Sequence, residues 1–320
     1  MNQAKWFSVR TELAPGRRTL LGICSFLLPL LMWAAISYVP GLWHPKMAIT
    51  EPGDVDYFQV GMLVDKAVFN AEAADMQAAH KAPPQGTPAN PIYLPGPLEV
   101  AGAFYHGLMT PPPQPDAPWL YQNLWHSIQI IFWGFLISSL IGVPLGILCG
   151  TYSAVSRISE PFIEFFRYLP APAFGALAVA VLGIYDAPKI AIIVIGTLFQ
   201  QILIIANTTR KLDFTLLEAA MTLGTRPFKM LTKVVIPGVL PDLYRDQRIL
   251  LGWAWTYLIV AELIGTSSGI TWYITQQARY QHFENVYAAI MTIGIIGLVC
   301  DQLLAWLGRR LFPWVRSQTS

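Results

Sequence analysis

The sequence predicts an all-helical membrane protein with six transmembrane helices and both termini in the cytosol. Of its 320 residues 54% are hydrophobic and only 12% are charged, and the mean hydropathy is +0.46. Soluble domains carry about 25% charged residues. Apolar runs of roughly 20 residues are typical of membrane-spanning helices. The chain has six such runs, over 19–42, 124–151, 162–184, 188–206, 249–265 and 286–307.

The orientation is predicted from where the basic residues lie. If the N-terminus is cytosolic, 16 of the 21 lysines and arginines fall on the cytosolic side, including those of 1–18 and 207–248. The other five are Lys46, Lys66, Lys81, Lys189 and Arg279. Short loops that stay in the cytosol carry this excess of positive charge. The net charge of +2 gives no indication of nucleic-acid binding.

The N-terminal third is predicted to hold three parts. A basic cytosolic lead, 1–18, precedes the first transmembrane helix, 19–42, and an external segment follows over 43–118. This segment has three lysines, eight acidic residues and many prolines, which favour turns and extended backbone. Surface helices are expected over Met62–His80 and Val100–Leu108. Both an ordered external cap and a contact surface for a periplasmic partner fit this composition.

The remaining chain is predicted to form a five-helix core, 119–310, and a cytosolic tail, 311–320. The start of the third run is ambiguous, because it contains Arg167 and several prolines. Residues 266–284 are too polar to span, so we expect a re-entrant or surface helix on the external side.

A polar segment, 211–237, separates the fourth run from the fifth. It predicts a helix from Thr215 to about Leu223, ended by Gly224, which tolerates a positive φ. Pro227 fits the first turn of a second helix, and Pro237 and Pro241 are expected to stop that helix before the fifth span. Two short helices at a fixed angle on the cytosolic side indicate a docking surface for a partner.

The spacing within this segment carries a family resemblance. Glu218-Ala219-Ala220 is followed after three residues by Gly224, and nine residues later by Val234-Val235-Ile236-Pro237. This resembles the EAA loop of ABC-importer permeases. The resemblance implies that an ATPase subunit docks on Glu218, Ala219, Ala220, Gly224, Arg226 and Pro237. Glu218 would then meet a basic groove of the partner; local pairing with Lys211 or Arg210 is the alternative.

Other motifs are similar to those of nitrate, sulfonate, taurine and bicarbonate permeases. They are Leu94-Pro95-Gly96-Pro97, Ser127, Gly142-Val143-Pro144-Leu145-Gly146, the Pro-x-x-Glu-x-x-Arg-x-x-Pro pattern of residues 161–170, Ala261-Glu262-Leu263-Ile264, Gly269 and Trp314. Two stretches depart from that pattern. Residues 44–90 are additional, and Tyr244-Arg245-Asp246-Gln247-Arg248 is more highly charged than the usual entry to the fifth span.

The resemblance implies a type I ABC-importer permease fold in the bacterial cytoplasmic (inner) membrane. The expected cargo is a small anion or zwitterion of the nitrate, sulfonate, taurine or bicarbonate class; an aromatic acid or a pyrimidine precursor is the alternative. Expected partners are ABC ATPase subunits, a second copy or close homologue, a soluble periplasmic or lipid-anchored substrate-binding protein, and membrane lipid.

The sequence contains no G-x-x-x-x-G-K-[ST] motif, so ATP and Mg²⁺ are expected on the partner ATPase and no cofactor is expected on this chain. Neither catalytic motifs nor metal-ligand spacing is found, which argues against an integral membrane enzyme. A channel would need a selectivity filter, and no such motif is seen.

Polar residues inside the apolar runs are candidates for function. Glu262 lies deep in the fifth run, where a carboxylate costs about 2.5–3.5 kcal/mol. It could face the path, lock the fifth span to a neighbour, or pair with Arg167 as a structural or gating ion pair, the interpretation we favour. Arg167 could instead reach the interface. Four residues of the fourth run could line a path or bond between helices: Thr197, Gln200, Gln201 and Asn207.

Overall fold

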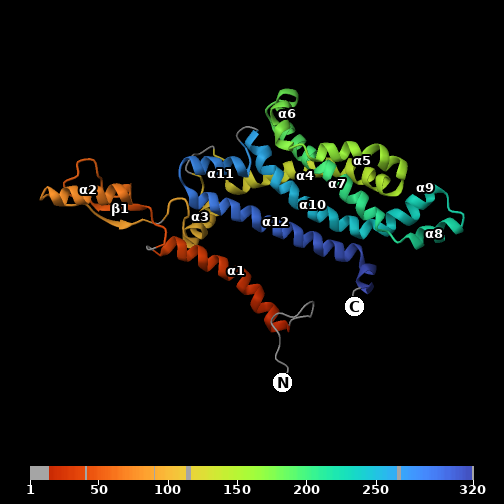
Figure 1. The fold of residues 1–320 in the computed structure, drawn as a ribbon, viewed down its shortest axis with the longest axis horizontal. Helices are drawn as coiled ribbons and strands as arrows, with labels where there is room; N and C mark the ends of the chain where they lie inside the picture. The colour runs from red at the N-terminus through yellow and green to blue at the C-terminus, as the bar shows by residue number, and fades with distance from the viewer. Residues whose placement is uncertain (1–13, 40–41, 90, 113–116, 265–267, 319–320) are drawn as a thin grey trace, which may run out of the picture. The chain divides into compact units, whose positions relative to one another are not determined.

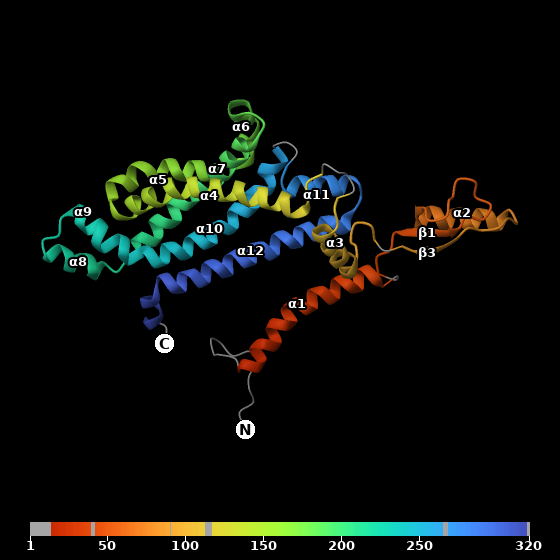
Figure 2. The same ribbon diagram turned by 180° about the vertical axis from the view of Figure 1, so that it is seen from behind.

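The computed structural model describes residues 14–39, 42–89, 91–112, 117–264 and 268–318 (Figures 1 and 2). Most of the predicted basic lead, 1–13, lies outside these ranges. The chain forms two compact units. The first comprises residues 1–106 with 280–288, and the second comprises residues 107–279 with 289–320.

The first unit combines helices with a small antiparallel sheet. Helix α1 (Pro15–Tyr38) precedes β1 (Lys46–Glu51), β2 (Leu63–Asp65), α2 (Lys66–Ala78), β3 (Gln85–Pro88) and α3 (Pro97–Met109). The strands lie in the order β2-β1-β3, with Met47 opposite both Val64 and Pro88. A core of five side chains lies in this part of the chain: Ile49, Val55, Phe58, Val64 and Phe69. Residues 46–88 are therefore an ordered module.

Helices were predicted in this segment, whereas strands were not. Helix α2 accounts for most of the predicted helix Met62–His80, but the beginning of that range forms β2; α3 matches the predicted helix Val100–Leu108. The three strands contain only three to six residues each. Strands that short leave little alternation of apolar and polar residues to detect.

The Leu94–Pro97 motif packs against the end of α1. The Trp33 indole donates to the Pro95 carbonyl at 2.9 Å, and the Ser37 hydroxyl donates to the Leu94 carbonyl at 3.1 Å. A β-carbon on Gly96 would collide with the Tyr38 ring, so glycine is required for this close approach. The prolines and the glycine of the motif thus fix the chain against the first helix.

The second unit is a helical bundle. It is built from α4 (Leu120–Thr151), α5 (Ser153–Arg167), the 3₁₀ turn η1 (Ala171–Phe174), α6 (Gly175–Leu182), α7 (Asp186–Arg210), α8 (Phe214–Thr222), α9 (Pro227–Met230), the π-turn η2 (Leu231–Val235), α10 (Ile236–Ile264), α11 (Ile270–Arg279), most of α12 (Phe283–Leu311) and the 3₁₀ turn η3 (Pro313–Gln318). Helices α4, α7 and α10 run side by side (Figures 1 and 2), and Ile192, Ile193, Ala254 and Leu258 lie fully buried among them.

A row of glycines sets the close contact between α4 and α7. β-carbons built on four glycines of α4 would each lie under 3.0 Å from a side chain of α7. The pairs are Gly134 with Ile193, Gly142 with Gln201, Gly146 with Ile205 and Gly150 with Thr209. Small residues let helix backbones approach closely, which is the usual basis of packing between membrane helices. The Gly142–Gly146 motif thus has a packing role.

The third apolar run is not a single straight helix. Helix α5 ends at Arg167, and the chain bends by 84° before continuing as η1 and α6. Pro170 and Pro172 lie at this break, where proline cannot donate the hydrogen bonds that would continue a helix. The ambiguous start of this run therefore corresponds to a real break.

The prediction that Pro237 and Pro241 stop the second coupling helix is wrong. Helix α10 passes through both prolines and continues to Ile264. Pro237 is the second residue of α10, where its missing N–H costs nothing. The π-turn η2 precedes it directly, so the second coupling helix and the fifth apolar run are joined without a loop.

Four helices among the described residues are long and apolar enough to cross a membrane: α1, α4, α7 and α12. The bent pair of α5 with η1 and α6 makes a fifth if it counts as one span. Helix α10 has the length, 29 residues, but charged residues occupy its first half. The fold is thus a multi-pass helical membrane protein, with four or five spans by this measure where the sequence predicts six.

Candidate functional site

The segment between α7 and α10, which we call the coupling segment (residues 211–237), has the predicted helix–glycine–helix form. Gly224 has a φ of +72°. Its N–H donates to the Met221 carbonyl at 2.9 Å, and the Thr225 N–H donates to the Ala220 carbonyl at 3.1 Å. These two bonds form a Schellman motif, which ends α8 and requires the left-handed conformation that glycine favours.

Both coupling helices also begin as the sequence dictates. The Asp213 carboxylate accepts hydrogen bonds from the Thr215 N–H at 2.9 Å and the Thr215 hydroxyl at 2.7 Å, and so caps α8. These bonds favour the charged form and hold the pKa of Asp213 below its ordinary value. Pro227 is the first residue of α9, and Arg226 lies exposed just before it. Asp213 was not among the predicted site residues.

The coupling segment presents apolar side chains to its surroundings. Leu223 is 85% exposed and Phe228 is 73% exposed. Ala219 and Glu218 are exposed beside them, whereas Ala220 is buried beneath α8. Exposed apolar clusters with polar neighbours are typical of protein interaction surfaces.

Glu218 makes no ion pair with Arg210 or Lys211 among the described contacts. Arg210 instead pairs with Glu160 of α5, and it also donates to the Cys149 carbonyl at the end of α4. Arg210 therefore joins the ends of α4 and α7 to the middle of α5. The local pairing considered for Glu218 is not formed.

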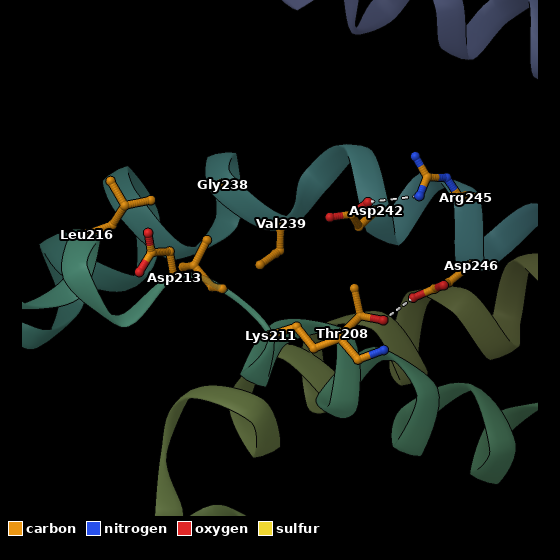
Figure 3. Close-up of a pocket in the computed structure, with 10 residues that line it drawn as sticks. Thr208, Lys211, Asp213, Leu216, Gly238, Val239, Asp242, Arg245 and Asp246 are labelled. Carbon is orange, nitrogen blue, oxygen red and sulfur yellow. Dashed lines mark hydrogen bonds and ion pairs between the residues drawn. The ribbon is translucent and has the colours of Figure 1, made fainter. Parts of the chain in front are cut away.

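Two cavities lie behind the coupling segment. One, of about 390 Å³, separates α8 from α10 and is lined by Lys211, Asp213, Asp242 and Asp246 (Figure 3). At its edge the Thr208 hydroxyl of α7 donates to Asp246 of α10 at 2.5 Å. The other, of about 430 Å³, lies between α8 and α9 and the ends of α4 and α7. Between them, Leu217, Met230 and Val235 of the coupling segment pack against a core cluster of α4, α7 and α10.

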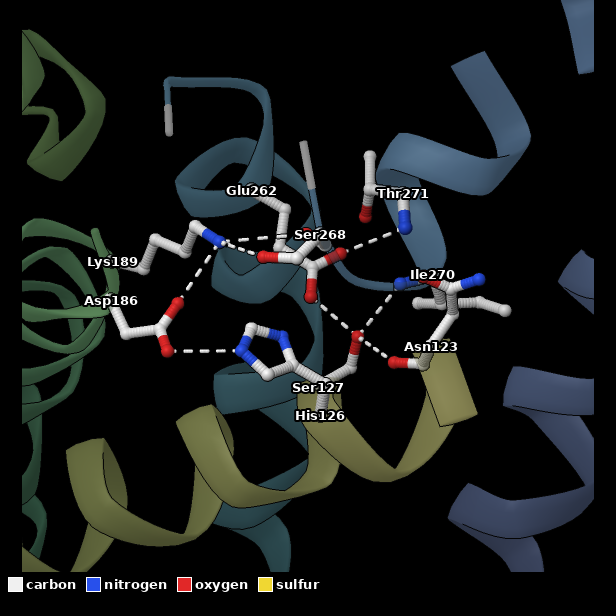
Figure 4. Close-up of polar contacts among 9 residues, drawn as sticks. All are labelled: Asn123, His126, Ser127, Asp186, Lys189, Glu262, Ser268, Ile270 and Thr271. Carbon is white, nitrogen blue, oxygen red and sulfur yellow. Dashed lines mark hydrogen bonds and ion pairs between the residues drawn. The ribbon is translucent and has the colours of Figure 1, made fainter. Parts of the chain in front are cut away.

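At the opposite end of α10, Glu262 is buried and holds the first turn of α11. Its carboxylate accepts from the Thr271 N–H at 2.7 Å and from the Ser127 hydroxyl of α4 (Figure 4). Ser127 Oγ in turn accepts from the Ile270 N–H at 2.8 Å. Gly269 lies against Glu262 at a φ of +106°, where a β-carbon would collide with the carboxylate. Glu262 caps a helix that belongs to a later part of the chain.

Lys189 of α7 reaches the same turn from another side and is only 1% exposed. Its ammonium group donates to Ser268 Oγ at 3.0 Å and to Asp186 Oδ1 at 3.2 Å. The other Asp186 oxygen lies 2.9 Å from Nε2 of His126. The sequence interpretation placed Lys189 outside the membrane core, and its burial was not predicted.

Arg167 does not pair with Glu262. The Arg167 guanidinium group is exposed, lies over the Tyr168 ring at 4.7 Å and donates to the Tyr168 hydroxyl at 3.0 Å. Lys189 is the cation that binds the same turn, and its ion-pair partner is Asp186. The Glu262 carboxyl group links α10 to α4 and α11 by hydrogen bonds.

A second acidic residue within an apolar run was overlooked by the sequence interpretation, which singled out Glu262 alone. Asp301 lies in the sixth apolar run and forms a bidentate salt bridge with Arg248 of α10. The guanidinium nitrogens lie 2.8 to 3.1 Å from the carboxylate oxygens. Two signals were available. Asp301 interrupts an apolar run, and Arg248 belongs to the charged stretch that departs from the family pattern.

The four candidate path residues of α7 occupy different environments. Gln201 is fully buried and bonds to Ser138, Ser139 and Gln247. Thr197 donates to a carbonyl of its own helix. Gln200 is half-buried, and Asn207 is exposed and accepts from Arg210 at 3.2 Å. The described hydrogen bonds of Gln201 link α7 to α4 and α10.

These features define a multi-pass helical membrane protein with a glycine-hinged surface segment suited to docking a partner. The chain belongs to the family of binding-protein-dependent transport system inner membrane components, whose sequence model matches residues 142–316, more than half of the chain. It is therefore an inner-membrane permease subunit of an ABC importer and is not itself an enzyme.

Individual relatives agree with this assignment. A probable ABC transporter permease of Brucella melitensis is 30% identical over 228 residues, which cover 71% of this chain and 90% of the relative. The taurine transport system permease TauC of Escherichia coli is 30% identical over 225 residues, which cover 70% of this chain and 81% of the relative. The fold is similar to that of a chain of the MetNI methionine ABC transporter, with a TM-score of 0.51 at 20% identity over 61% of this chain and 94% of that one.

Proposed function

We propose that this permease subunit moves a small anion or zwitterion of the nitrate, sulfonate, taurine or bicarbonate class into the cytosol. The support is the identity with a taurine permease over most of its length, together with the motifs around Ser127, Gly142 and Glu262. Cargo identity rests on this similarity alone, so a permease of the same build for an aromatic acid or a pyrimidine precursor is the alternative.

The proposed topology has six spans with both termini in the cytosol. We assign α10 as the fifth span, although it lacks the hydropathy of the other spans. Its second half is largely apolar, and in its charged first half Arg248 is paired with Asp301. The bent pair α5–α6 supplies the third. The excess of lysine and arginine in 207–248 puts the coupling segment on the cytosolic side.

The coupling segment is proposed as the docking site of the ATPase subunit, which would hold ATP and Mg²⁺. The observation that carries this proposal is its surface: two helices fixed by the Gly224 turn, with Leu223 and Phe228 exposed and Glu218 without an ion-pair partner among the described residues. Glu218, Ala219, Ala220, Gly224, Arg226 and Pro237 are the proposed coupling residues. A second permease copy or a close homologue, and a substrate-binding protein, would complete the importer.

Docking can be tested by co-purification with the ATPase subunit. Leu223→Ala and Phe228→Ala should each weaken ATPase binding by about tenfold, since each removes an exposed apolar anchor. Leu98→Ala is the matched control, because Leu98 is 79% exposed but lies outside the coupling segment. Equal binding in all three variants would contradict docking at this surface.

The cargo is tested by ATP-driven uptake into proteoliposomes that contain the complete importer and its binding protein. Radiolabelled taurine, bicarbonate, nitrate, an alkanesulfonate and benzoate are compared. Uptake of one of the first four supports the proposal. Uptake of benzoate alone would move the assignment to the alternative class.

A further inference from the structure

The two helices that flank the coupling segment, α7 and α10, both contact one turn at the other end of the second unit. Helix α7 ends at Arg210, just before α8, and α10 begins at Ile236, directly after η2. At their opposite ends, Lys189 lies in the first turn of α7 and Glu262 in the last turn of α10. Both side chains hold residues 268–271, where α11 begins (Figure 4).

Helices α7 and α10 are joined along their length. Gly196 of α7 accepts the Tyr257 ring so closely that a β-carbon would lie 2.8 Å from it. Further along, the Gln201 amide donates to the Gln247 oxygen at 2.6 Å, and the Thr208 hydroxyl donates to Asp246 at 2.5 Å. At 1.5 Å per residue, α10 carries its backbone about 40 Å from Ile236 to Glu262. Helices joined at three levels over this length resist bending relative to each other.

The turn at the far end is held by an acceptor and a donor on different helices. The Glu262 carboxyl group of α10 accepts the Thr271 N–H, and the Lys189 amino group of α7 donates to the Ser268 hydroxyl. Ser127 closes the arrangement, since its hydroxyl accepts from Ile270 and donates to Glu262. Leaving buried donors and acceptors without hydrogen bonds costs free energy, so separation of α11 from α7 and α10 is disfavoured.

From this geometry we propose that α7 and α10 act as one lever, with the coupling segment at its tip, and that Glu262, Lys189 and Ser127 are positioning residues that fix α11 to the lever's other end. A displacement of the coupling segment is then transmitted to α11 without a change in the distance between them. This inference rests on the proposed docking of the ATPase, which supplies the displacement.

The hydrogen bonds that hold residues 268–271 are tested by amide hydrogen exchange of the purified permease. Ser127→Ala removes the partner of the Ile270 N–H, so exchange in peptides covering 268–275 should rise about fivefold to thirtyfold, the range for loss of a helix cap. Glu262→Gln should raise it less, because the amide oxygen can still accept from Thr271. Ser138→Ala is the control: it removes a buried hydroxyl of α4 that bonds to Gln201, and it should leave 268–275 unchanged.

Transmission is tested in the complex with its ATPase subunits. Spin labels on cysteines at Lys229 of α9 and Arg279 of α11, in a background without native cysteines and diluted with unlabelled protein, report the distance within one chain. In the otherwise unmodified protein, the distance distribution should stay narrow and unchanged when ATP and vanadate are added. In Ser127→Ala and Glu262→Gln it should broaden and shift with nucleotide, while the ATPase stays bound.

Three results would overturn the inference. They are a nucleotide-dependent shift of the distance in the unmodified protein, an unchanged narrow distribution in both variants, and loss of the ATPase subunits from both variants, which would make the residues part of assembly. Failure of the docking proposal is seen separately, because Leu223→Ala and Phe228→Ala would then retain the ATPase subunit as well as Leu98→Ala does.

Discussion

The coupling segment and the α11 turn, at opposite ends of the α7–α10 pair, are built in contrasting ways. The coupling segment takes its form from bonds between near neighbours, such as Gly224 with Met221, and it exposes apolar side chains. The α11 turn is formed by residues as far apart as Ser127 and Ile270, which are 143 positions apart, and it buries charges. A surface that must bind and release a partner can be local, whereas a rigid junction between helices needs distant parts of the chain.

The largest effect is expected in an experiment that asks which side of the membrane each end faces. In a background where Cys24, Cys149 and Cys300 are replaced by alanine, a cysteine at Arg279 should react with an impermeant thiol reagent added outside intact cells. A cysteine at Lys229 should react only after the membrane is permeabilised. Both positions are exposed, so accessibility to solvent does not differ. The opposite labelling pattern would invert the proposed topology.

The next effect concerns the buried charges. Lys189→Met should lower the free energy of unfolding by about 3–5 kcal/mol, because it leaves the Asp186 carboxylate without its lysine partner. Adding Asp186→Asn should recover part of this loss, since both charges of the pair are then removed. The matched comparison is Arg167→Gln with Glu262→Gln, which should be additive because these residues do not meet. Thermal unfolding in detergent across both cycles measures the coupling, and equal coupling in the two cycles would contradict the charge pairing described here.

A smaller effect is expected at the glycine hinge. Gly224→Val forces a β-branched residue into a φ of +72°, at a cost of about 1–3 kcal/mol, and should release the ATPase subunit without preventing membrane insertion. Gly224→Asn should retain most of the binding, because asparagine tolerates the left-handed region. A β-carbon at Gly224 would have no other atom within 4 Å, so the strain expected at this position comes from the backbone. Equal ATPase binding in both variants would remove the hinge from the coupling mechanism.

The smallest effect is the pH dependence of the α8 cap. Because the folded pKa of Asp213 lies below its ordinary value of 3.8, the cap stabilises α8 fully above that value and is lost as the pH falls through the folded pKa. Amide exchange of residues 214–222 should therefore differ between the unmodified protein and Asp213→Ala at pH 6, and the difference should shrink below about pH 3.8. A difference that grew on acidification would contradict the capping role.

The same contrast explains what could be predicted from the sequence. The ends of α8, the positive φ at Gly224 and the start of α9 follow from residues that are adjacent in the chain. The apolar runs predicted most of the long helices for the same reason. By contrast, the sequence could not show that Glu262 bonds to Ser127 and Thr271 and not to Arg167, because these contacts depend on how α4, α10 and α11 pack.

Other differences have identifiable causes. The continuity of α10 through Pro237 and Pro241 was missed because proline was taken as a stop signal, whereas Pro237 lies in the first turn of α10 and Pro241 lies inside the helix. The strands β1 to β3 were too short to show a pattern. Asp301 was visible as a charge within an apolar run, but only the structure shows that Arg248 neutralises it.

The glycine row between α4 and α7 restricts the kinds of motion that transport can use. Sliding one helix along the other would carry the branched side chains of Ile193 and Ile205 out of the recesses over Gly134 and Gly146 and onto larger residues. Shear between these two helices is therefore blocked sterically, whereas rotation of the pair as one body about a distant hinge meets no such obstacle. An importer built on this chain would open and close by tilting blocks of helices.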